Sequence, residues 1–315
     1  MSKIVIALGG NALGNTPKEQ YENAIITAKE IVSIIGLGNL VTITHGNGPQ
    51  IGMINSGFET ASSQNKSIPI MPFPECGAMS QGYIGYHLQN AIQNELKRNG
   101  IQRDVISIIT QIEVNPDDHA FLNPTKPIGR FYNEDEAIVI NKEKNYIMKE
   151  DAGRGFRRVV PSPFPINIIE INVIKTLIEN NHIVITCGGG GIPVIRNKDF
   201  LKGVDAVIDK DYASSLLARQ IDADILLILT AIDHVMINFN KVNQKELKDI
   251  SLDEAKLFLQ NNEFASGSME PKIKAGIDFL ETNPYGTVII TSLGNAEQAL
   301  SGHFGTRIKN LRRVK

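Results

Sequence analysis

Short apolar runs rich in β-branched residues recur along this chain, and each run ends in glycine or in a polar turn. Segments with helical periodicity lie between these runs, at residues 24–35, 78–100, 167–180, 211–221, 251–260 and 272–281. Continuous apolar strands that alternate with helices form a mostly parallel sheet, and helices cover both of its faces. The sequence therefore predicts an α/β fold with a mainly parallel central sheet, whose strands lie within residues 3–11, 40–48, 182–191, 225–233 and 286–295.

The helix predicted at residues 78–100 carries a clear apolar stripe. Its members recur every three or four positions: Ile84, Leu88, Ala91, Ile92 and Leu96. Such spacing places all five on one face of a helix. Gly100 follows, and glycine is the residue favoured just past a helix C-terminus.

The segment from Asp117 to Pro161 interrupts the alternation of strands and helices. It is charged and rich in turn residues, and its better strand candidates are residues 136–140 and 145–150, which we predict to form a hairpin. We interpret the segment as an excursion that projects from the domain and acts as a lid. A surface insertion without a role is the alternative interpretation.

The composition is typical of a globular protein and excludes several functional classes. Hydrophobic residues make up 42% of the 315 residues and charged residues 21%. The net charge of -2 gives no electrostatic footprint for nucleic acid. Cys76 and Cys187 are far apart, which argues against a disulfide framework or a structural zinc site. The N-terminal apolar run ends at Gly9 and Gly10 and is too short for a signal peptide or a membrane span. We expect a soluble, cytoplasmic protein without nucleic-acid or membrane partners.

Three glycine-rich loops follow predicted strands, and the third holds four consecutive glycines, Gly188 to Gly191. The run is too short and too closely flanked by apolar residues to be a flexible linker. Because glycine is costly to order, the run predicts a backbone that approaches something bulky and negatively charged. A plain tight turn explains any one of these loops equally well. Three at strand-to-helix junctions favour backbone N–H groups that bind an anion. Pro49, in the second loop, suits the first position of a helix.

Common phosphate-binding and hydrolase motifs are absent from the sequence. It contains no GxxxxGK[ST] P-loop, no HExxH and no GxSxG, and its nearest approach to GxGxxG has the spacing GxGxxxG. Anion binding by the glycine-rich loops would therefore not follow any of these known motifs.

Two lysines lie where helices are predicted to begin, Lys210 and Lys272. A cation at a helix N-terminus is electrostatically disfavoured, so both suggest an anionic partner such as a polyphosphate. The alternatives are solvated lysines or, for Lys210, a surface pair with Asp209 or Asp211. Asp211 either holds both lysines in place or is an ordinary acidic residue of a first helical turn.

Nine ordered sequence blocks resemble the signature segments of the carbamate kinase family, within the amino acid kinase superfamily. They span residues 7–273, so the likeness covers essentially the whole chain. The blocks are "ALGGNAL", "THGNGPQIG", "PECGAMSQGYIGY", "KPIGRFY", "RRVVPSPFP", "CGGGGIPV", "GVDAVIDKDYAS", "LTAIDHV" and "GSMEPKI".

The resemblance implies a single domain over residues 1–315, a three-layer αβα sandwich with a small protruding subdomain at residues 117–160. The N-terminal half, about residues 1–160, would hold the small substrate, and the C-terminal half, about 161–315, the nucleotide. The implied reaction is reversible phosphoryl transfer between ATP and carbamate, giving ADP and carbamoyl phosphate. The implied setting is a cytoplasmic homodimer that makes ATP in arginine catabolism by the arginine deiminase pathway. Mg²⁺ would be held mainly by the phosphates, without a dedicated protein site.

The resemblance also implies roles for individual residues. The catalytic group would be Lys126, Lys210, Asp211 and Lys272. The loops around the transferred phosphoryl group and carbamate would be formed by Gly9, Gly10, Asn11, Gly46, Asn47 and Gly48. The nucleotide would be bound by Gly188, Gly189, Gly190, Asp233, Asn238, Ser268 and Met269.

Two positions bear on the subgroup. Relatives that phosphorylate acyl amino acids usually carry a lysine where this chain has Ala7, so Lys126 is the cation expected to cover the transferring group. Glu270 lies beside the expected phosphate site and would repel an anion unless it points to solvent or to a metal ion. A sibling kinase acting on an acyl amino acid or uridylate, and a nucleotide-binding regulatory module without catalysis, are the alternatives.

Overall fold

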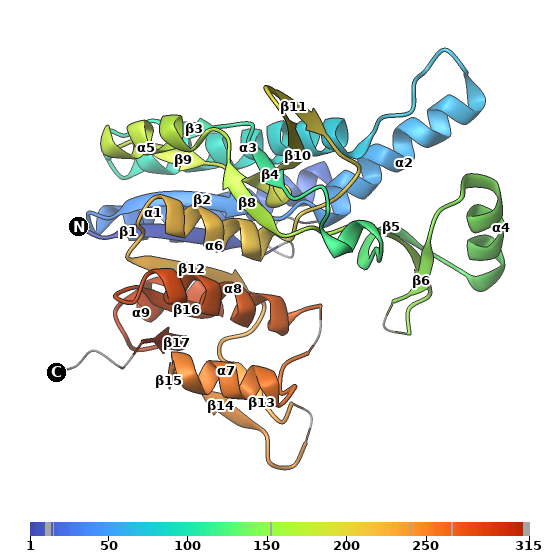
Figure 1. Ribbon diagram of the computed structural model, residues 1–315. Helices are drawn as coiled ribbons and strands as arrows, with labels where there is room; N and C mark the ends of the chain where they lie inside the picture. Colours follow the sequence, from blue (N-terminus) through green and yellow to red (C-terminus); the bar gives the residue numbers. More distant parts are fainter. Residues whose placement is uncertain (10–13, 15, 152, 240, 266, 311–315) are drawn as a thin grey trace.

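The computed structural model describes residues 1–9, 14, 16–151, 153–239, 241–265 and 267–310 (Figure 1). An eight-stranded sheet runs through the molecule in the order β15-β17-β16-β12-β1-β2-β9-β3. Neighbouring strands are parallel except for the antiparallel pair β16 and β17. All five predicted strands belong to this sheet, as β1 (Lys3–Leu8), β2 (Leu40–His45), β9 (Ile183–Ile185), β12 (Ile225–Thr230) and β16 (Thr287–Ser292). The other members are β3 (Val105–Ser107), β15 (Asp249–Ser251) and β17 (Thr306–Lys309).

Helices cover both faces of the sheet, and β1 shows how. Val5 and Ala7 belong to one core cluster, while Ile4, Ile6 and Leu8 belong to another, because successive side chains of a strand point to opposite faces. The first cluster is completed by α5 (Ile171–Glu179), α6 (Lys210–Gln220), α7 (Leu252–Gln260) and α8 (Met269–Thr282). The second is completed by α1 (Pro17–Gly36), α3 (Phe73–Arg98) and α9 (Ala296–Leu300). The predicted three-layer αβα sandwich is confirmed.

Local sequence signals set the helix ends. Thr16 accepts a hydrogen bond from the backbone of Glu19 and caps α1. The predicted apolar stripe of α3 is buried along its whole length. Gly100 has a φ of +70°, which confirms it as the residue just past the end of α3.

Two smaller sheets flank the main one. The first has the order β11-β10-β4-β8, with strands at Phe200–Gly203, Ile192–Asn197, Gln111–Val114 and Pro165–Ile168. The second is the hairpin of β13 (Val235–Ile237) and β14 (Lys245–Leu247). The structure also contains single turns of 3-10 helix: η2 (His119–Phe121), η3 (Gly188–Gly190) and η4 (Leu293–Asn295).

The protruding subdomain lies away from the main sheet, at the right of Figure 1. It consists of α4 (Glu134–Lys144) and a three-stranded sheet, β5-β7-β6, with strands at Lys126–Tyr132, Phe156–Val160 and Met148–Glu150. The hairpin predicted within it is wrong in its first half, because residues 136–140 lie in α4. A capping box between Asn133 and Glu136 starts this helix and outweighs the strand preference of the apolar run. The second predicted strand, residues 145–150, is confirmed only in its last three residues, which form β6 and pair with β7.

In the part of the chain that the structure describes, no helix combines the length and the apolar character that crossing a bilayer requires.

Candidate active site

The carboxyl ends of the central strands meet at one edge of the main sheet. Leu8, the last residue of β1, pairs with His45 of β2 and with Leu229 of β12. On the next strand along, Ile185 of β9 pairs with Ile43 of β2. The three glycine-rich loops therefore leave the same edge of the sheet, which is where ligands bind in open α/β folds.

The four-glycine run packs against protein rather than against open space. Gly188, Gly189 and Gly190 are buried, and the last two have φ angles of +65° and +93°. A Cβ atom on these three residues would collide with His45, Asn47 and Ile208, respectively. The run thus lets the loop after β2 and the segment before α6 approach each other closely. The bulky group predicted beside it is this protein surface, and contact with a nucleotide stays a prediction.

Gly9 and Gly46 continue the hydrogen bonding of the sheet by one residue beyond β1 and β2. The N–H of Gly9 donates to the carbonyl of Leu229 at 3.1 Å, and the N–H of Gly46 donates to that of Leu8 at 3.2 Å. A Cβ atom on Gly9 would lie 2.9 Å from the same Leu229 oxygen, which explains the glycine. Both N–H groups are therefore occupied, so these two residues shape the edge rather than offer free donors.

The loop after β2 leads into α2 (Gly48–Gln64), which begins one residue before Pro49, so this proline lies in the first turn but not at the predicted first position. Asn47 is buried, and its Nδ2 donates to Ser80 Oγ at 2.8 Å. A Cβ atom on Gly48 would meet nothing within 4 Å, so this residue faces open space at the helix N-terminus. Gly10 and Asn11, the other predicted members of this group, lie outside the described residues.

His45 is uncharged at neutral pH. Burial lowers its pKa to about 4, and the charge of Lys210 acts in the same direction against a hydrogen bond to Gly46. Because a carbonyl oxygen can only accept, Nδ1 carries the proton that it shares with the Gly46 oxygen at 2.9 Å.

Two lysines and one carboxylate form a cluster at the starts of α6 and α8. Lys210 Nζ lies 2.9 Å from one oxygen of Asp211, and Lys272 Nζ lies 3.0 Å from the other. The side chains of Lys210, Lys272 and Asp211 are only 12%, 14% and 5% exposed. Asp211 therefore holds both lysines, and Lys210 is not a solvated surface residue. The structure brings together the three groups that the sequence singled out.

Electrostatics keep this cluster charged. Burial alone would raise the pKa of Asp211, but Lys210 and Lys272 outweigh it and lower the pKa to about 2. The Lys210 ammonium is buried and, among the described residues, has no hydrogen-bond partner of good geometry despite its short distance to Asp211. A buried donor without such a partner is costly, and an anion bound beside Lys210 would supply one.

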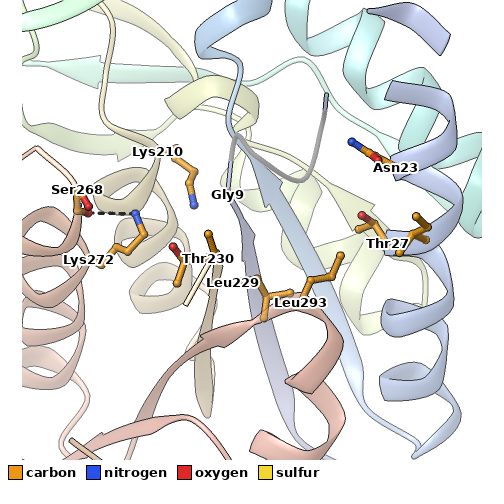
Figure 2. Close-up of a pocket in the computed structure, with 11 residues that line it drawn as sticks. Gly9, Asn23, Thr27, Lys210, Leu229, Thr230, Ser268, Lys272 and Leu293 are labelled. Carbon is orange, nitrogen blue, oxygen red and sulfur yellow. Dashed lines mark hydrogen bonds between the residues drawn. The ribbon is translucent and has the colours of Figure 1, made fainter. Parts of the chain in front are cut away.

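A cavity of about 430 Å³ opens beside the cluster (Figure 2), within the size range of ligand sites. Figure 2 shows the ammonium ends of Lys210 and Lys272 on one side of the cavity, with Asn23 and Thr27 of α1 across from them. The sequence did not single out most of the lining residues. Besides the two lysines, the cavity is lined by Gly9, Asn23, Ile26, Thr27, Leu229, Thr230, Ala231, Ser268 and Leu293.

The predicted nucleotide-side residues divide into two groups. Ser268 lines the cavity, its carbonyl accepts a hydrogen bond from Lys272 at 3.3 Å, and the neighbouring Met269 is buried. Asp233 and Asn238 do not line the cavity. Instead Asp233 accepts a hydrogen bond from Asn295 at 3.0 Å, and Asn238 donates its N–H to Glu263 at 3.2 Å.

Glu270 pairs with Lys274, one turn further along α8, at 2.5 Å. This ion pair offsets the negative charge of Glu270, which would otherwise repel an anion at the expected phosphate site.

Lys126, at the start of β5, does not line the cavity. Its ammonium lies 2.6 Å from Asp209 Oδ2. Asp209 is the N-cap of α6, and the sequence interpretation gave it no role beyond a possible surface pair with Lys210. The signal was present, because aspartate directly before a helix is a preferred cap.

Comparisons with known proteins agree with this geometry. The model of the amino acid kinase family matches residues 2–292. The chain therefore belongs to the amino acid kinase family, and it is a phosphotransferase.

Within that family its resemblance to carbamate kinases is confirmed. Carbamate kinase 2 of Staphylococcus epidermidis is 54% identical over 310 residues, which cover 98% of this chain and 100% of that protein. The carbamate kinase of Giardia lamblia bound to AMP-PNP has a TM-score of 0.90 and 45% identity, over 98% of each chain. The UMP kinase of Bacillus anthracis, with 15% identity and a TM-score of 0.51, shares the fold alone.

Proposed function

We propose that this protein transfers a phosphoryl group reversibly between ATP and carbamate, giving ADP and carbamoyl phosphate. The observation that carries the proposal is the buried cluster of Lys210, Asp211 and Lys272 beside the cavity. Similarity to carbamate kinases over the whole chain, one of them bound to AMP-PNP, supports the choice of substrates.

The two cluster lysines serve the phosphates of the nucleotide. Each ammonium is oriented by one oxygen of Asp211, so neither has to be ordered when the substrate arrives. Phosphoryl transfer depends mainly on positioning and on stabilising negative charge. Preorganised cations in a water-poor site do both.

Carbamate needs no general base, because it is already an anion. This fits a site in which His45 is buried with its pKa lowered to about 4, and in which Asp211 is held by two lysines. The obstacle is repulsion between carbamate and the polyphosphate. Lys126 of the protruding subdomain, together with the N-terminal turn of α2, is the group that we assign to the carbamate side.

Mg²⁺ would accompany the nucleotide and reduce the charge on its phosphates. The two carboxylates at the start of α6, Asp209 and Asp211, are each paired with lysine ammonium groups. We therefore assign the coordination of Mg²⁺ mainly to phosphate oxygens rather than to these side chains.

Finer features of the proposal follow from the same similarity. The half of the chain before about residue 160 holds carbamate, and the half after it holds the nucleotide. The protein acts as a cytoplasmic homodimer and runs toward ATP in arginine catabolism by the arginine deiminase pathway. The free, buried Cys76 and Cys187 fit a reducing compartment.

A coupled assay of ATP formed from ADP and carbamoyl phosphate tests the proposal directly. Carbamate kinase activity that needs both substrates and Mg²⁺ is the expected result. Activity with an acyl phosphate or with UDP instead would indicate a sibling kinase. Binding of ADP without turnover of any of these would indicate a regulatory module. Ala7 stands in the position where acyl amino acid kinases usually carry lysine, which already argues against an acyl amino acid kinase.

A further inference from the structure

One carboxylate connects the protruding subdomain with α6. Asp209 Oδ2 lies 2.6 Å from Lys126 Nζ, at the start of β5. The other oxygen, Oδ1, accepts the backbone N–H of Asp211 at 2.9 Å and caps α6. Each oxygen of Asp209 thus has a separate partner, one in the protruding subdomain and one in the helix that carries the catalytic cluster.

The segment that ends at Asp209 is fixed on several sides. The N–H of Val207 donates to the carbonyl of Pro161, just after β7, at 3.0 Å. Asp205 accepts the N–H of Phe73, the first residue of α3, at 3.1 Å. Ile208 fits against Gly190, which has no Cβ atom to collide with it. Residues 205–209 are therefore a rigid base onto which Lys126 docks.

The docking point is where the protruding subdomain joins the body of the protein. Lys126 pairs with Val160 across β5 and β7, the strands by which the subdomain leaves and re-enters the main domain. The contacts made by Asp209 and Val207 hold both strands at this junction. A change at Asp209 is thus expected to alter the position of the whole subdomain.

The ion pairs at the first turn of α6 show what Asp209 contributes. Three ammonium groups, Lys126, Lys210 and Lys272, face two carboxylates, Asp209 and Asp211. Asp211 already uses both oxygens on two lysines, so Asp209 supplies the carboxylate for the third. The Lys126 side chain is 34% exposed, so the ion pair with Asp209 is only partly buried.

We propose that Asp209 is a positioning residue for phosphoryl transfer, which fixes Lys126 at the first turn of α6 beside Lys210. This inference rests on the proposed function. Asp209 thus links the protruding subdomain to the start of the catalytic helix through one side chain. The Lys126 ammonium is therefore held in position before carbamate or carbamoyl phosphate binds.

Asparagine at this position separates the two tasks of Asp209. Asn caps a helix as well as Asp does but carries no charge for Lys126. Asp209→Asn, Lys126→Ala and the double variant form a cycle that measures coupling between the two side chains. Ser251→Ala, which removes the cap of α7 without touching the protruding subdomain, is the matched control.

Steady-state kinetics are the first measurement. We expect Asp209→Asn to lower kcat about tenfold, the low end for losing a charged hydrogen bond. The KM for carbamoyl phosphate should rise while the KM for ADP stays unchanged. In the Lys126→Ala background the same change should have no further effect. Full activity of Asp209→Asn, or losses that multiply in the double variant, would overturn the proposal.

Hydrogen exchange of the ligand-free protein is the second measurement and does not depend on activity. Asp209→Asn and Lys126→Ala should speed exchange in residues 126–132 and 156–160 equally, and Ser251→Ala should not. Unchanged exchange in Asp209→Asn would overturn the docking role. A wild-type protein without carbamate kinase activity would overturn the proposed function instead, and the exchange result would still decide whether Asp209 docks Lys126.

Discussion

The main sheet and the protruding subdomain are stabilised by different interactions. The central strands are buried on both faces, with Val5, Ile6, Val184 and Leu227 wholly inaccessible to solvent. In the subdomain, α4 buries Ala137 while its other residues are exposed or half-buried. At its base, Ile128 of β5 and Val160 of β7 join a small apolar cluster with Phe73 of α3. Burial of apolar surface therefore dominates the stability of the first region and, in the second, is largely confined to this base.

Charged and aromatic side chains attach the subdomain to the body. Glu59 of α2 accepts a hydrogen bond from Lys144 at 2.8 Å and another from Tyr146. The guanidinium group of Arg158 lies 3.5 Å from the centroid of the Tyr146 ring and 4.9 Å from that of Phe73. Burial would raise the pKa of Glu59, but these hydrogen bonds lower it overall, so the carboxylate stays charged.

The comparison predicts which region is rigid and which region moves. The lysine cluster lies at the edge of the main sheet, whereas Lys126 belongs to a subdomain that is attached by one small apolar cluster at its base and, beyond it, by polar contacts. Polar contacts near the surface are individually weak, so the subdomain is expected to open at a lower free energy than the sheet. Catalysis would then use a fixed phosphate site and a movable cover.

Removal of a cluster lysine tests the fixed site and should have the largest effect. We expect Lys210→Ala or Lys272→Ala to lower kcat about 10²–10³-fold, the scale for losing one preorganised charge-stabilising donor. Circular dichroism should show an intact fold. Lys256→Ala, which removes an exposed ion pair with Glu281 and does not line the cavity, is the control and should stay near wild type. Near-normal turnover in both cluster variants would rule out their assignment.

Removal of Lys126 tests the movable cover. We expect Lys126→Ala to lower kcat about 10²-fold, because one cation at the transferring group is lost, with ADP affinity unchanged. Calorimetric titration with ADP measures that affinity. Lys149→Ala, whose ammonium donates to the Pro124 carbonyl within the same region, is the matched control. An equal loss of ADP binding would argue against a role on the carbamate side.

The pH dependence of stability tests how strongly the cluster is coupled to the fold. The pKa of Asp211 in the folded protein, about 2, lies below its unfolded value of about 3.9. Its contribution, about 2–3 kcal/mol by linkage, is present at pH above the unfolded value and disappears as the pH falls toward 2. In urea titrations, Asp211→Asn should therefore differ most from wild type near pH 6 and least near pH 3. A difference that does not vary with pH would contradict the assigned pKa.

Weakening the attachment of the subdomain should have the smallest effect. Glu59→Gln removes the charge that pairs with Lys144 and Arg158. We expect exchange of amides in residues 134–150 to accelerate by about three- to tenfold, since near-surface ion pairs are worth up to about 1 kcal/mol each. The amides of β1 and β12 should be unaffected. Equal acceleration in those strands would mean that the two regions unfold together.

The same contrast decides what the sequence can reveal. Strands buried on both faces appear as continuous apolar runs, so residues 3–8 and 225–230 are predictable without a structure. A lysine at a helix N-terminus is electrostatically disfavoured, so Lys210 and Lys272 can be recognised as candidate site residues from the sequence. Residues 136–140 are wrongly predicted as a strand, because a short apolar run is compatible with either a strand or a helix. The capping box at Asn133 favours the helix.

Contacts between distant segments lie beyond such reasoning. Lys126 and Asp209 are separated by 83 positions, and no local pattern pairs them. The four glycines were recognisable as a close approach, but not as an approach to His45, Asn47 and Ile208. Side chains that line the cavity from α1, such as Asn23 and Thr27, are ordinary helix residues until the fold places them.

The most direct test of the account is the affinity for ADP of a Lys210→Met/Lys272→Met variant, measured by calorimetry against wild type. Methionine keeps the apolar stem of each lysine and removes only the charge. If the two ammonium groups form the phosphate site, the affinity should fall by at least about 10²-fold, since each charged hydrogen bond contributes about 1.5–3 kcal/mol. Unchanged ADP binding by a folded variant would contradict the central claim.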